Sequence, residues 1–281
     1  MVATDEQQAA KAGATGASGS PAPTGTACYV YGIVPASGTG SAAGKLPAVG
    51  GDSEARVDYV RHEDIAAAVS PLNSDRPLGR PEDLRAHADV LNALAATGAP
   101  VLPFRFGTVL QDPRAVEEDV LAKGHATFVT ALERLSGRAQ FTLRAVYDED
   151  ALLREILTDR PDIAELREAT AEMPEEAAYY QRVRLGELIV ESISARREKD
   201  TADIKERLGP LADAMVVSEA PTDDGVTDIA FLVSDDRRAD FERTADALAG
   251  QWHTRIRMRL LGPLAPYDFV AEAMEEQEGD T

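Results

Sequence analysis

The clearest alternation of apolar and polar positions lies in the middle of the chain, at residues 140–147. The four apolar positions of this segment fall on one side of an extended backbone, and Thr142 and Arg144 fall on the other. A period of two residues is typical of a strand with one buried face. We therefore predict a half-buried strand here.

Two helices are predicted further along. The first spans about 175–208, after a helical region interrupted at Pro161 and Pro174, and the second follows a cap at Ser234 or Asp235. Both carry apolar residues at helical spacing. These apolar positions are Ala178, Leu185, Leu188, Ile189 and Ile193 in the first helix, and Phe241, Ala245 and Leu248 in the second.

Three further strands are predicted at 214–220, 228–234 and 252–261. Together with 140–147 they give the order β-α-β-β-α-β, which is typical of a ferredoxin-like sandwich. We therefore predict that 139–270 forms a C-terminal domain with a modified ferredoxin-like fold and a long helical insertion.

The N-terminal half predicts a separate α+β domain at 27–138, whose topology the pattern leaves open. Apolar, β-rich segments predict extended structure at 27–34, 55–60, 65–70 and 101–110. In the last of these, Arg105 either reaches the surface or forms a buried ion pair, and we expect the pair. Gly107 is expected to supply the backbone freedom for a turn.

This half also predicts two helices. Pro81 starts the first and Gly98 ends it, whereas Asp112 caps the second, Pro113 occupies its first position and Gly137 ends it. The expected buried positions are Leu84, Ala88, Leu91 and Ala95 in the first helix, and Val116, Leu121, Phe128, Leu132 and Leu135 in the second.

The sequence predicts a disordered tail at 1–26 and a solvated acidic tail at 271–281. Residues 1–26 are small, polar and rich in Gly, Ala, Ser, Thr and Pro, so they offer too little apolar surface to offset their ordering entropy. Residues 271–281 are acidic and contain no basic residue.

Composition narrows the possible partners. The 281 residues include 49 acidic and 29 basic side chains, a net charge of −20. Such a surface repels nucleic acid and anionic lipid, so we expect neither as a partner. Cys28 is a single cysteine, no apolar run reaches the ~20 residues of a membrane span, and the N-terminus does not resemble a secretory signal. We therefore expect a cytoplasmic protein.

Sequence motifs of catalysis are missing. The chain has no phosphate-binding glycine loop, no nucleophile elbow and no zinc-protease motif. The histidines, His62, His87, His125 and His253, are isolated in the sequence, so we expect no metal site and no cofactor. His87 could act as a general base, but a half-buried histidine that packs against a sheet is favoured because no nucleophile or orienting carboxylate can be paired with it.

The last predicted strand carries a row of basic residues opposite its apolar face. Helices cover one face of a ferredoxin-like sheet, so this row is expected on the open face beside the strand at 140–147, as a docking surface for an acidic partner. Pairing with the chain's own acids, such as Glu219 or Asp228, is the slightly favoured alternative. The last strand contributes His253, Arg255, Arg257 and Arg259 to this row, and the strand at 140–147 contributes Arg144.

Three segments resemble the hallmark sequences of the GvpL/GvpF gas vesicle family. They are YVYGIV at 29–34, LPFRFGTVL at 102–110 and GPLAPYDFV at 262–270, and LPFRFGTV is the most specific. The last departs from the family pattern at Leu264 and Ala265, where Trp and Pro are typical. The resemblance covers about 29–270 and leans towards the F branch. It marks His87, Leu102, Pro103, Arg105, Phe106 and Gly107 as structural motif residues, and Pro263, Pro266, Tyr267 and Phe269 as candidate partner contacts.

The resemblance implies a cytoplasmic, gas-vesicle-associated accessory protein with two α+β domains and no enzymatic activity. It implies that the partners are the small hydrophobic shell protein GvpA and other accessory proteins, bound in a chaperone-like or minor shell-associated role. A small-ligand-binding protein or enzyme, and a general regulatory binding module, are the alternatives. The oligomeric state stays open.

Overall fold

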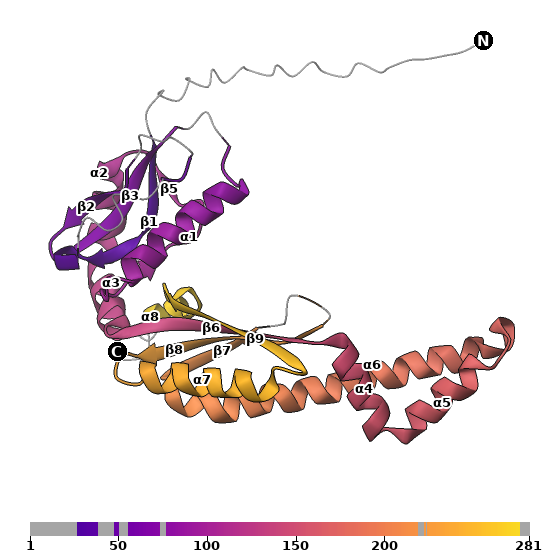
Figure 1. Cartoon of the computed structure of the whole chain (residues 1–281). Helices are drawn as coiled ribbons and strands as arrows, with labels where there is room; N and C mark the ends of the chain where they lie inside the picture. Colours follow the sequence, from indigo (N-terminus) through magenta and orange to yellow (C-terminus); the bar gives the residue numbers. More distant parts are fainter. Residues whose placement is uncertain are drawn as a thin grey trace, which may run out of the picture.

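The computed structural model describes residues 27–38, 48–50, 56–73, 77–218, 222 and 224–275. The tail expected at 1–26, the residues after 275 and the suggested ion-pair partner Glu219 lie outside these residues. The described chain forms two antiparallel sheets with helices packed on them (Figure 1).

The first sheet is centred on β1 (Ala27–Pro35). This strand pairs antiparallel with β3 (Ile65–Leu72) on one side, and with the short strands β4 (Leu102–Pro103) and β5 (Val109–Leu110) on the other. β2 (Asp58–His62) forms the edge beside β3. The central residues of β1 are all buried, because helices cover both faces of the sheet. This double cover explains why β1 is continuously apolar instead of alternating.

Two strand predictions in this half need correction. The strand expected at 55–60 begins three residues later and ends two residues later, because the β2–β3 turn falls at Glu63 and Asp64. The segment expected to be extended over 101–110 forms two short strands, separated by a turn at Gly107 with φ 88°. The turn at Gly107 itself is confirmed.

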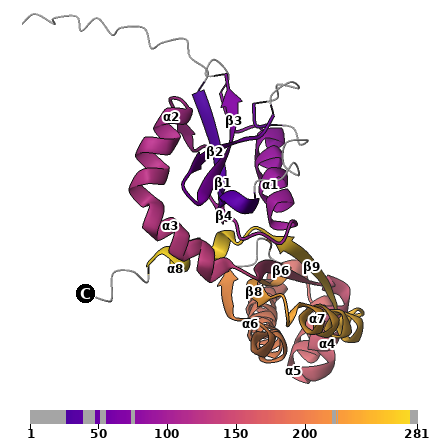
Figure 2. The same ribbon diagram turned by 90° about the vertical axis from the view of Figure 1, so that its left-hand side faces the viewer.

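Helix α1 (Pro81–Ala95) covers one face of this sheet, and the continuous helical run that ends in α3 covers the other (Figure 2). The predicted start of α1 is confirmed, but its buried stripe is displaced by one residue, and Leu84 is 50% exposed. The residues of α1 that pack inward are Asp83, Ala86, His87, Val90, Leu91 and Leu94.

The run on the second face consists of α2 (Pro113–Ala115), the π-helical stretch η3 (Val116–Leu121) and α3 (Ala122–Leu135). The Asp112 carboxylate accepts a hydrogen bond from the Ala115 amide at 2.8 Å, which confirms the predicted N-cap. All five apolar positions expected on this run are buried, and the chain turns at Gly137 with φ 66°.

The second sheet contains β6 (Arg138–Tyr147), β7 (Ala214–Ser218), β8 (Gly225–Ser234) and β9 (Ile256–Leu264) in the spatial order β7-β8-β6-β9. Every neighbouring pair is antiparallel. The alternation predicted for β6 is confirmed, because its four apolar residues are buried and Arg144 on the other face is exposed.

Helices α6 (Glu175–Leu208) and α7 (Arg238–Trp252) cover the buried face of β6 (Figure 1). The bounds of α6 match the prediction. Helix α7 begins after Arg237 and includes Trp252, so the predicted cap at Ser234 or Asp235 is wrong, and the last strand begins at Ile256 instead of Trp252.

Two shorter helices, α4 (Glu149–Asp159) and α5 (Pro161–Ala171), precede α6. With the N-terminal part of α6 they form an arm that extends beyond the second sheet (Figure 1). Pro161 occupies the first turn of α5. Short 3-10 turns follow β1 (Ala36–Gly38) and α6 (Gly209–Leu211).

The C-terminal segment packs back onto the N-terminal half of the molecule. The turn η5 (Tyr267–Phe269) leads into α8 (Val270–Glu275), which lies against α3. Phe269 and Ala273 share a core with Phe128 of α3 and with residues of β8. The tail predicted from residue 271 is therefore helical as far as Glu275, and Ala273 within it is buried.

Candidate functional site

A buried histidine lies where the three resemblance segments meet. His87 on α1 is 3% exposed, its Nδ1 lies 2.9 Å from the Tyr29 hydroxyl, and its Nε2 lies 3.2 Å from the Phe104 carbonyl oxygen. Because a carbonyl can only accept, Nε2 carries the proton and Nδ1 accepts from the tyrosine. The hydroxyl oxygen in turn accepts from the Gly107 amide at 3.1 Å.

Burial lowers the pKa of His87, while the bond to the Phe104 carbonyl offsets part of that change. Burial also raises the pKa of Tyr29 to about 12, so its hydroxyl keeps the proton that it donates. Both groups are therefore neutral near pH 7. From the sequence we expected a half-buried histidine, but His87 is fully buried in a chain of hydrogen bonds that includes Tyr29, Phe104 and Gly107.

Aromatic rings surround the His87 imidazole. Tyr31 stacks on it with ring centroids 5.7 Å apart, Phe106 meets it edge-on at 5.6 Å, and Tyr267 from the C-terminal segment lies 6.3 Å away. The Ala265 amide also donates to Asn92 Oδ1 on α1 at 3.3 Å. This cluster therefore fastens the end of the chain to the first sheet.

Two expectations about the segment at 102–110 have different outcomes. Leu102 and Pro103 are buried in β4 beside β1, in keeping with a structural role. Arg105 is exposed, and its carbonyl accepts from the Thr108 amide at 3.3 Å and the Thr108 hydroxyl at 2.8 Å. The prediction of a buried ion pair for Arg105 is therefore wrong.

The predicted basic row is only partly present. Arg257 and Arg259 are exposed on the sheet face opposite α6 and α7, and Arg144 lies beside Arg259 in the strand register. Arg144 Nε lies 2.9 Å from Asp228 Oδ2, which is one of the internal pairings considered from the sequence. His253 follows α7 and does not belong to the strand. The remaining basic row is Arg144, Arg257 and Arg259.

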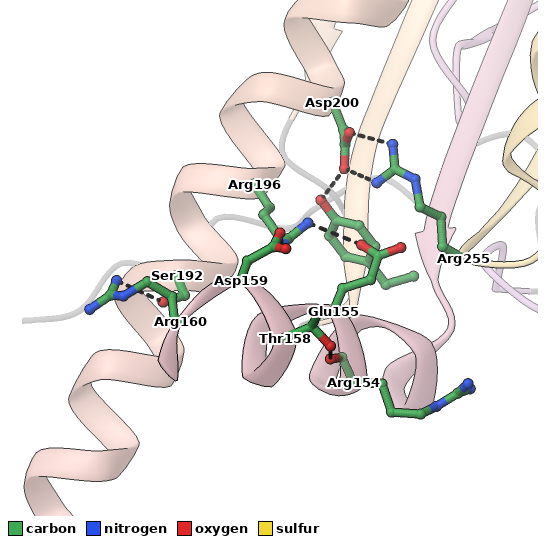
Figure 3. A network of polar contacts seen from close by, with 10 residues as sticks. Arg154, Glu155, Thr158, Asp159, Arg160, Ser192, Arg196, Asp200 and Arg255 are labelled. Atoms are coloured by element: carbon green, nitrogen blue, oxygen red, sulfur yellow. Dashed lines mark hydrogen bonds and ion pairs between the residues drawn. The ribbon is translucent and has the colours of Figure 1, made fainter. Parts of the chain in front are cut away.

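Arg255 belongs to a different environment. Its guanidinium forms two hydrogen bonds of 2.7 Å to Asp200 on α6 and lies 4.7 Å from the ring centroid of Trp252. The Tyr147 hydroxyl donates to the same carboxylate at 2.7 Å. Figure 3 shows Asp200 directed from α6 towards Arg255. Sequence reasoning missed this contact, since the three residues are far apart along the chain.

Further polar contacts follow along α6 towards the arm. Arg196 binds Glu155 at 3.0 Å and also Asp159, both on α4, and Arg160 Nη1 lies 3.4 Å from the Ser192 hydroxyl (Figure 3). These contacts join α4 to α6 and fix the direction in which the arm leaves the sheet.

The outer face of the arm is apolar and exposed. Tyr180 is 80% exposed and Val190 is 63% exposed, on a face of α6 other than the one where Leu185 and Leu188 pack on the core. Single exposed apolar residues are ordinary, but four of them within one side of α6 make that side a candidate interaction surface. We call this row, Tyr179, Tyr180, Val183 and Val190, the arm face. Its spacing was visible in the sequence, although we assigned only the opposite stripe.

The candidate contacts near the C-terminus differ in accessibility. Pro266 and Phe269 are buried against the N-terminal half, so they face the chain's own core. Tyr267 is 40% exposed, and Pro263, which follows a cis peptide bond, is partly exposed. Only these two can meet a partner directly. Among the described residues, no helix combines the length and apolar character required to cross a membrane.

Comparison with known proteins gives one consistent result. The model of the family "Gas vesicle synthesis protein GvpL/GvpF" matches residues 27–271. Gas vesicle protein F of Streptomyces sp. (strain CB03234) is 34% identical over 244 residues, 86% of this chain and 98% of the relative. Gas vesicle protein L of the same strain is 31% identical over 247 residues, 77% of this chain and 84% of the relative.

Two solved structures share the fold. The crystal structure of gas vesicle protein GvpF from Anabaena sp. PCC7120 has a TM-score of 0.70 at 22% identity, covering 87% of this chain and 98% of that chain. GvpF from Microcystis aeruginosa has a TM-score of 0.66 at 22% identity, covering 87% and 99%. At this identity the likeness concerns the fold alone.

Proposed function

The chain belongs to the GvpL/GvpF family of gas vesicle synthesis proteins and has a role in gas vesicle formation; within that role, we propose that it binds the hydrophobic shell protein GvpA and other accessory proteins as a chaperone-like or minor shell-associated component. We place this role in the cytoplasm, and the proposal includes no catalytic activity and no cofactor.

The arm face is the observation that carries this proposal. Its four apolar side chains, Tyr179, Tyr180, Val183 and Val190, are between 46% and 80% exposed on a helix that extends away from the body of the protein. Transfer of apolar surface from water to an apolar partner gains about 25 cal/mol per Å². A small hydrophobic shell protein is a partner that would supply the matching surface.

Charge explains why the complex would stay in solution. A net charge of −20 makes the accessory protein self-repelling and soluble, and a bound apolar partner would share that protection. The basic row is a second candidate contact, because Arg257 and Arg259 are exposed where an acidic segment could reach them. Tyr267 and Pro263 border the junction between the two halves.

The proposal extends to domain organisation. We assign residues 27–138 to an N-terminal α+β domain and 139–270 to a C-terminal domain with a modified ferredoxin-like fold. The order β7-β8-β6-β9, with helices before β7 and before β9, supports this assignment. The core shared by α3, β8 and α8 makes the two domains one packed unit.

The test is recovery of co-expressed GvpA with the full chain, with an unrelated acidic protein as a control. Val183→Glu combined with Val190→Glu places two negative charges on the arm face, and Ala195→Glu, compared with each single variant, adds one negative charge at an exposed position on another side of α6. Arg257→Glu combined with Arg259→Glu tests the basic row and leaves the Arg255–Asp200 pair intact.

Salt-resistant recovery that is lost only in the Val183/Val190 variant would support the arm face. Salt-sensitive recovery that is lost in the Arg257/Arg259 variant would assign the contact to the basic row. If folded wild-type protein recovers no GvpA, the shell-protein proposal is wrong. A pocket that joins His87, Arg105 and a carboxylate would support the small-ligand alternative, but His87 is buried and Arg105 is exposed.

A further inference from the structure

The tip of the β2–β3 hairpin presents two adjacent carboxylates. His62 pairs with Ile65 in the strand register, so Glu63 and Asp64 form a two-residue turn. Glu63 has φ 51°, in the left-handed region that costs a residue with a side chain about 1–2 kcal/mol. Asn or Gly would fold this turn more easily, so the sequence places a carboxylate where local stability disfavours it.

Helix α3 brings an imidazole to these carboxylates. His125 Nε2 lies 2.6 Å from Asp64 Oδ1 and 3.4 Å from Glu63 Oε2. One ligand atom from each of the three side chains lies within 4.8 Å of the others. The His125 side chain is 26% exposed, so an ion could reach it from solvent.

A second histidine lies beside this group. The ring centroids of His62 and His125 are 5.7 Å apart, and His62 Nδ1 lies 3.7 Å from Glu117 Oε1 on η3. Two imidazoles and three carboxylates therefore meet between the hairpin and the helical run. Two of the four histidines that are isolated in the sequence, His62 and His125, are therefore neighbours in space, which corrects the basis on which no metal site was expected.

We propose that Glu63, Asp64 and His125 bind a divalent transition-metal ion such as Zn²⁺. Imidazole nitrogen and carboxylate oxygen are ordinary zinc ligands, with metal–ligand distances of about 2.0–2.2 Å. Tetrahedral ligands at those distances lie roughly 3.3 Å apart, so the Asp64–His125 contact widens slightly and the Glu63–His125 contact stays as it is. The ion takes the place of the hydrogen between His125 Nε2 and Asp64 Oδ1, and the neutral imidazole then carries its hydrogen on Nδ1. A water molecule completes the coordination.

A simple hydrogen bond between His125 and Asp64 accounts for less of this arrangement. That bond would fasten the hairpin to α3 with one carboxylate, and it does not account for the second carboxylate, Glu63, in a left-handed conformation within 3.4 Å of the same imidazole nitrogen. With a bound ion, the extra negative charge attracts the cation, and His62 and Glu117 line its approach.

The experiment uses the full chain, treated with a chelator and dialysed. Zn²⁺ is titrated calorimetrically and in thermal unfolding, with Mg²⁺ as a hard-ion comparison. We expect saturable binding of one Zn²⁺ and a higher unfolding temperature with Zn²⁺ than with Mg²⁺. His125→Ala and Asp64→Asn should each weaken Zn²⁺ binding at least about tenfold. His253→Ala removes an exposed imidazole at the end of α7 and should leave the affinity unchanged.

Circular dichroism of the metal-free variants checks that they fold. Because His125 and Asp64 are both accessible to solvent, their replacement removes ligands without opening the core. Equal Zn²⁺ affinity in wild type, His125→Ala and Asp64→Asn would overturn the proposal, and so would the lack of saturable binding. A loss of affinity in His253→Ala as large as that in His125→Ala would also overturn it, since the ion would then bind elsewhere.

Discussion

Replacement of Asp200 tests whether a buried ion pair holds α6 on the second sheet. The Asp200 side chain is 4% exposed, and it receives two hydrogen bonds from Arg255 and one from Tyr147. Asp200→Asn keeps the shape of the side chain but removes the charge that balances the guanidinium. Loss of one partner from a buried ion pair costs about 3–5 kcal/mol, because the other charge is left uncompensated.

Two further variants separate the contributions of this site. Tyr147→Phe removes one hydrogen bond to a charged group and should cost about 1.5–3 kcal/mol. Arg184→Ala removes an exposed pair with Glu187 on the same helix, whose side chains are both 60% exposed, and should change stability by less than about 1 kcal/mol.

The assay is urea unfolding at pH 7, followed by circular dichroism. For a chain of this length, a loss of about 3–5 kcal/mol should also lower the unfolding midpoint temperature by roughly 6–20 °C, at 2–4 °C per kcal/mol. An Asp200→Asn variant that loses less than about 1 kcal/mol, the ordinary value for a surface pair, would refute the argument from burial. An Asp200→Ala/Arg255→Ala double-mutant cycle would then measure the coupling directly.

Two other predictions concern the first sheet. Burial lowers the pKa of His87, so below about pH 6.5 the unfolded chain binds a proton on this residue that the folded chain does not. As the pH falls towards the folded pKa, the free energy of unfolding should therefore decrease by up to about 1.4 kcal/mol per pH unit. Urea midpoints between pH 7.5 and 5 should show this dependence weakened in His87→Gln and kept in His253→Gln; parallel curves for all three proteins would contradict it. A Cβ at Gly32 would lie 2.7 Å from the Leu102 carbonyl oxygen, so Gly32→Ala should lose about 1–3 kcal/mol of unfolding free energy. Gly186→Ala, where a Cβ meets no atom within 4 Å on an exposed helix, should gain up to about 1 kcal/mol, and a loss in both glycine variants would show that contact geometry is not the cause.

Structure was predicted best from the sequence where a short repeat of apolar residues or a few neighbouring residues determine it. The alternation in β6 assigns each residue to a face without knowledge of its neighbours, and Asp112 with Pro113 marks a helix start by local chemistry alone. In α1 the helical period was visible, but its phase depends on where the rings of Tyr29 and Tyr31 lie, and β1 brings those rings from elsewhere in the chain.

The candidate sites were less predictable because tertiary contacts create them. Arg255 and Arg257 alternate as strand residues would, yet α7 continues to Trp252, so Arg255 precedes the strand and turns to Asp200. His62 and His125 are brought together only when the β2–β3 hairpin packs on the helical run that ends in α3. Asp200 and Arg255 are 55 positions apart, and His62 and His125 are 63 positions apart. No periodic pattern in the sequence links residues at such separations.

The return of the C-terminal segment affects how the protein is made. Ala265 belongs to a core that includes Tyr29 and Val34, and Phe269 belongs to one that includes Cys28 and Val30. At about 5–20 residues per second, the ribosome needs on the order of 10 s to synthesise the second half after the first has emerged. During that interval the first sheet lacks the residues that complete its cores. The nascent chain therefore displays apolar surface until residues 265–269 have emerged, and a product truncated before them would keep that surface exposed.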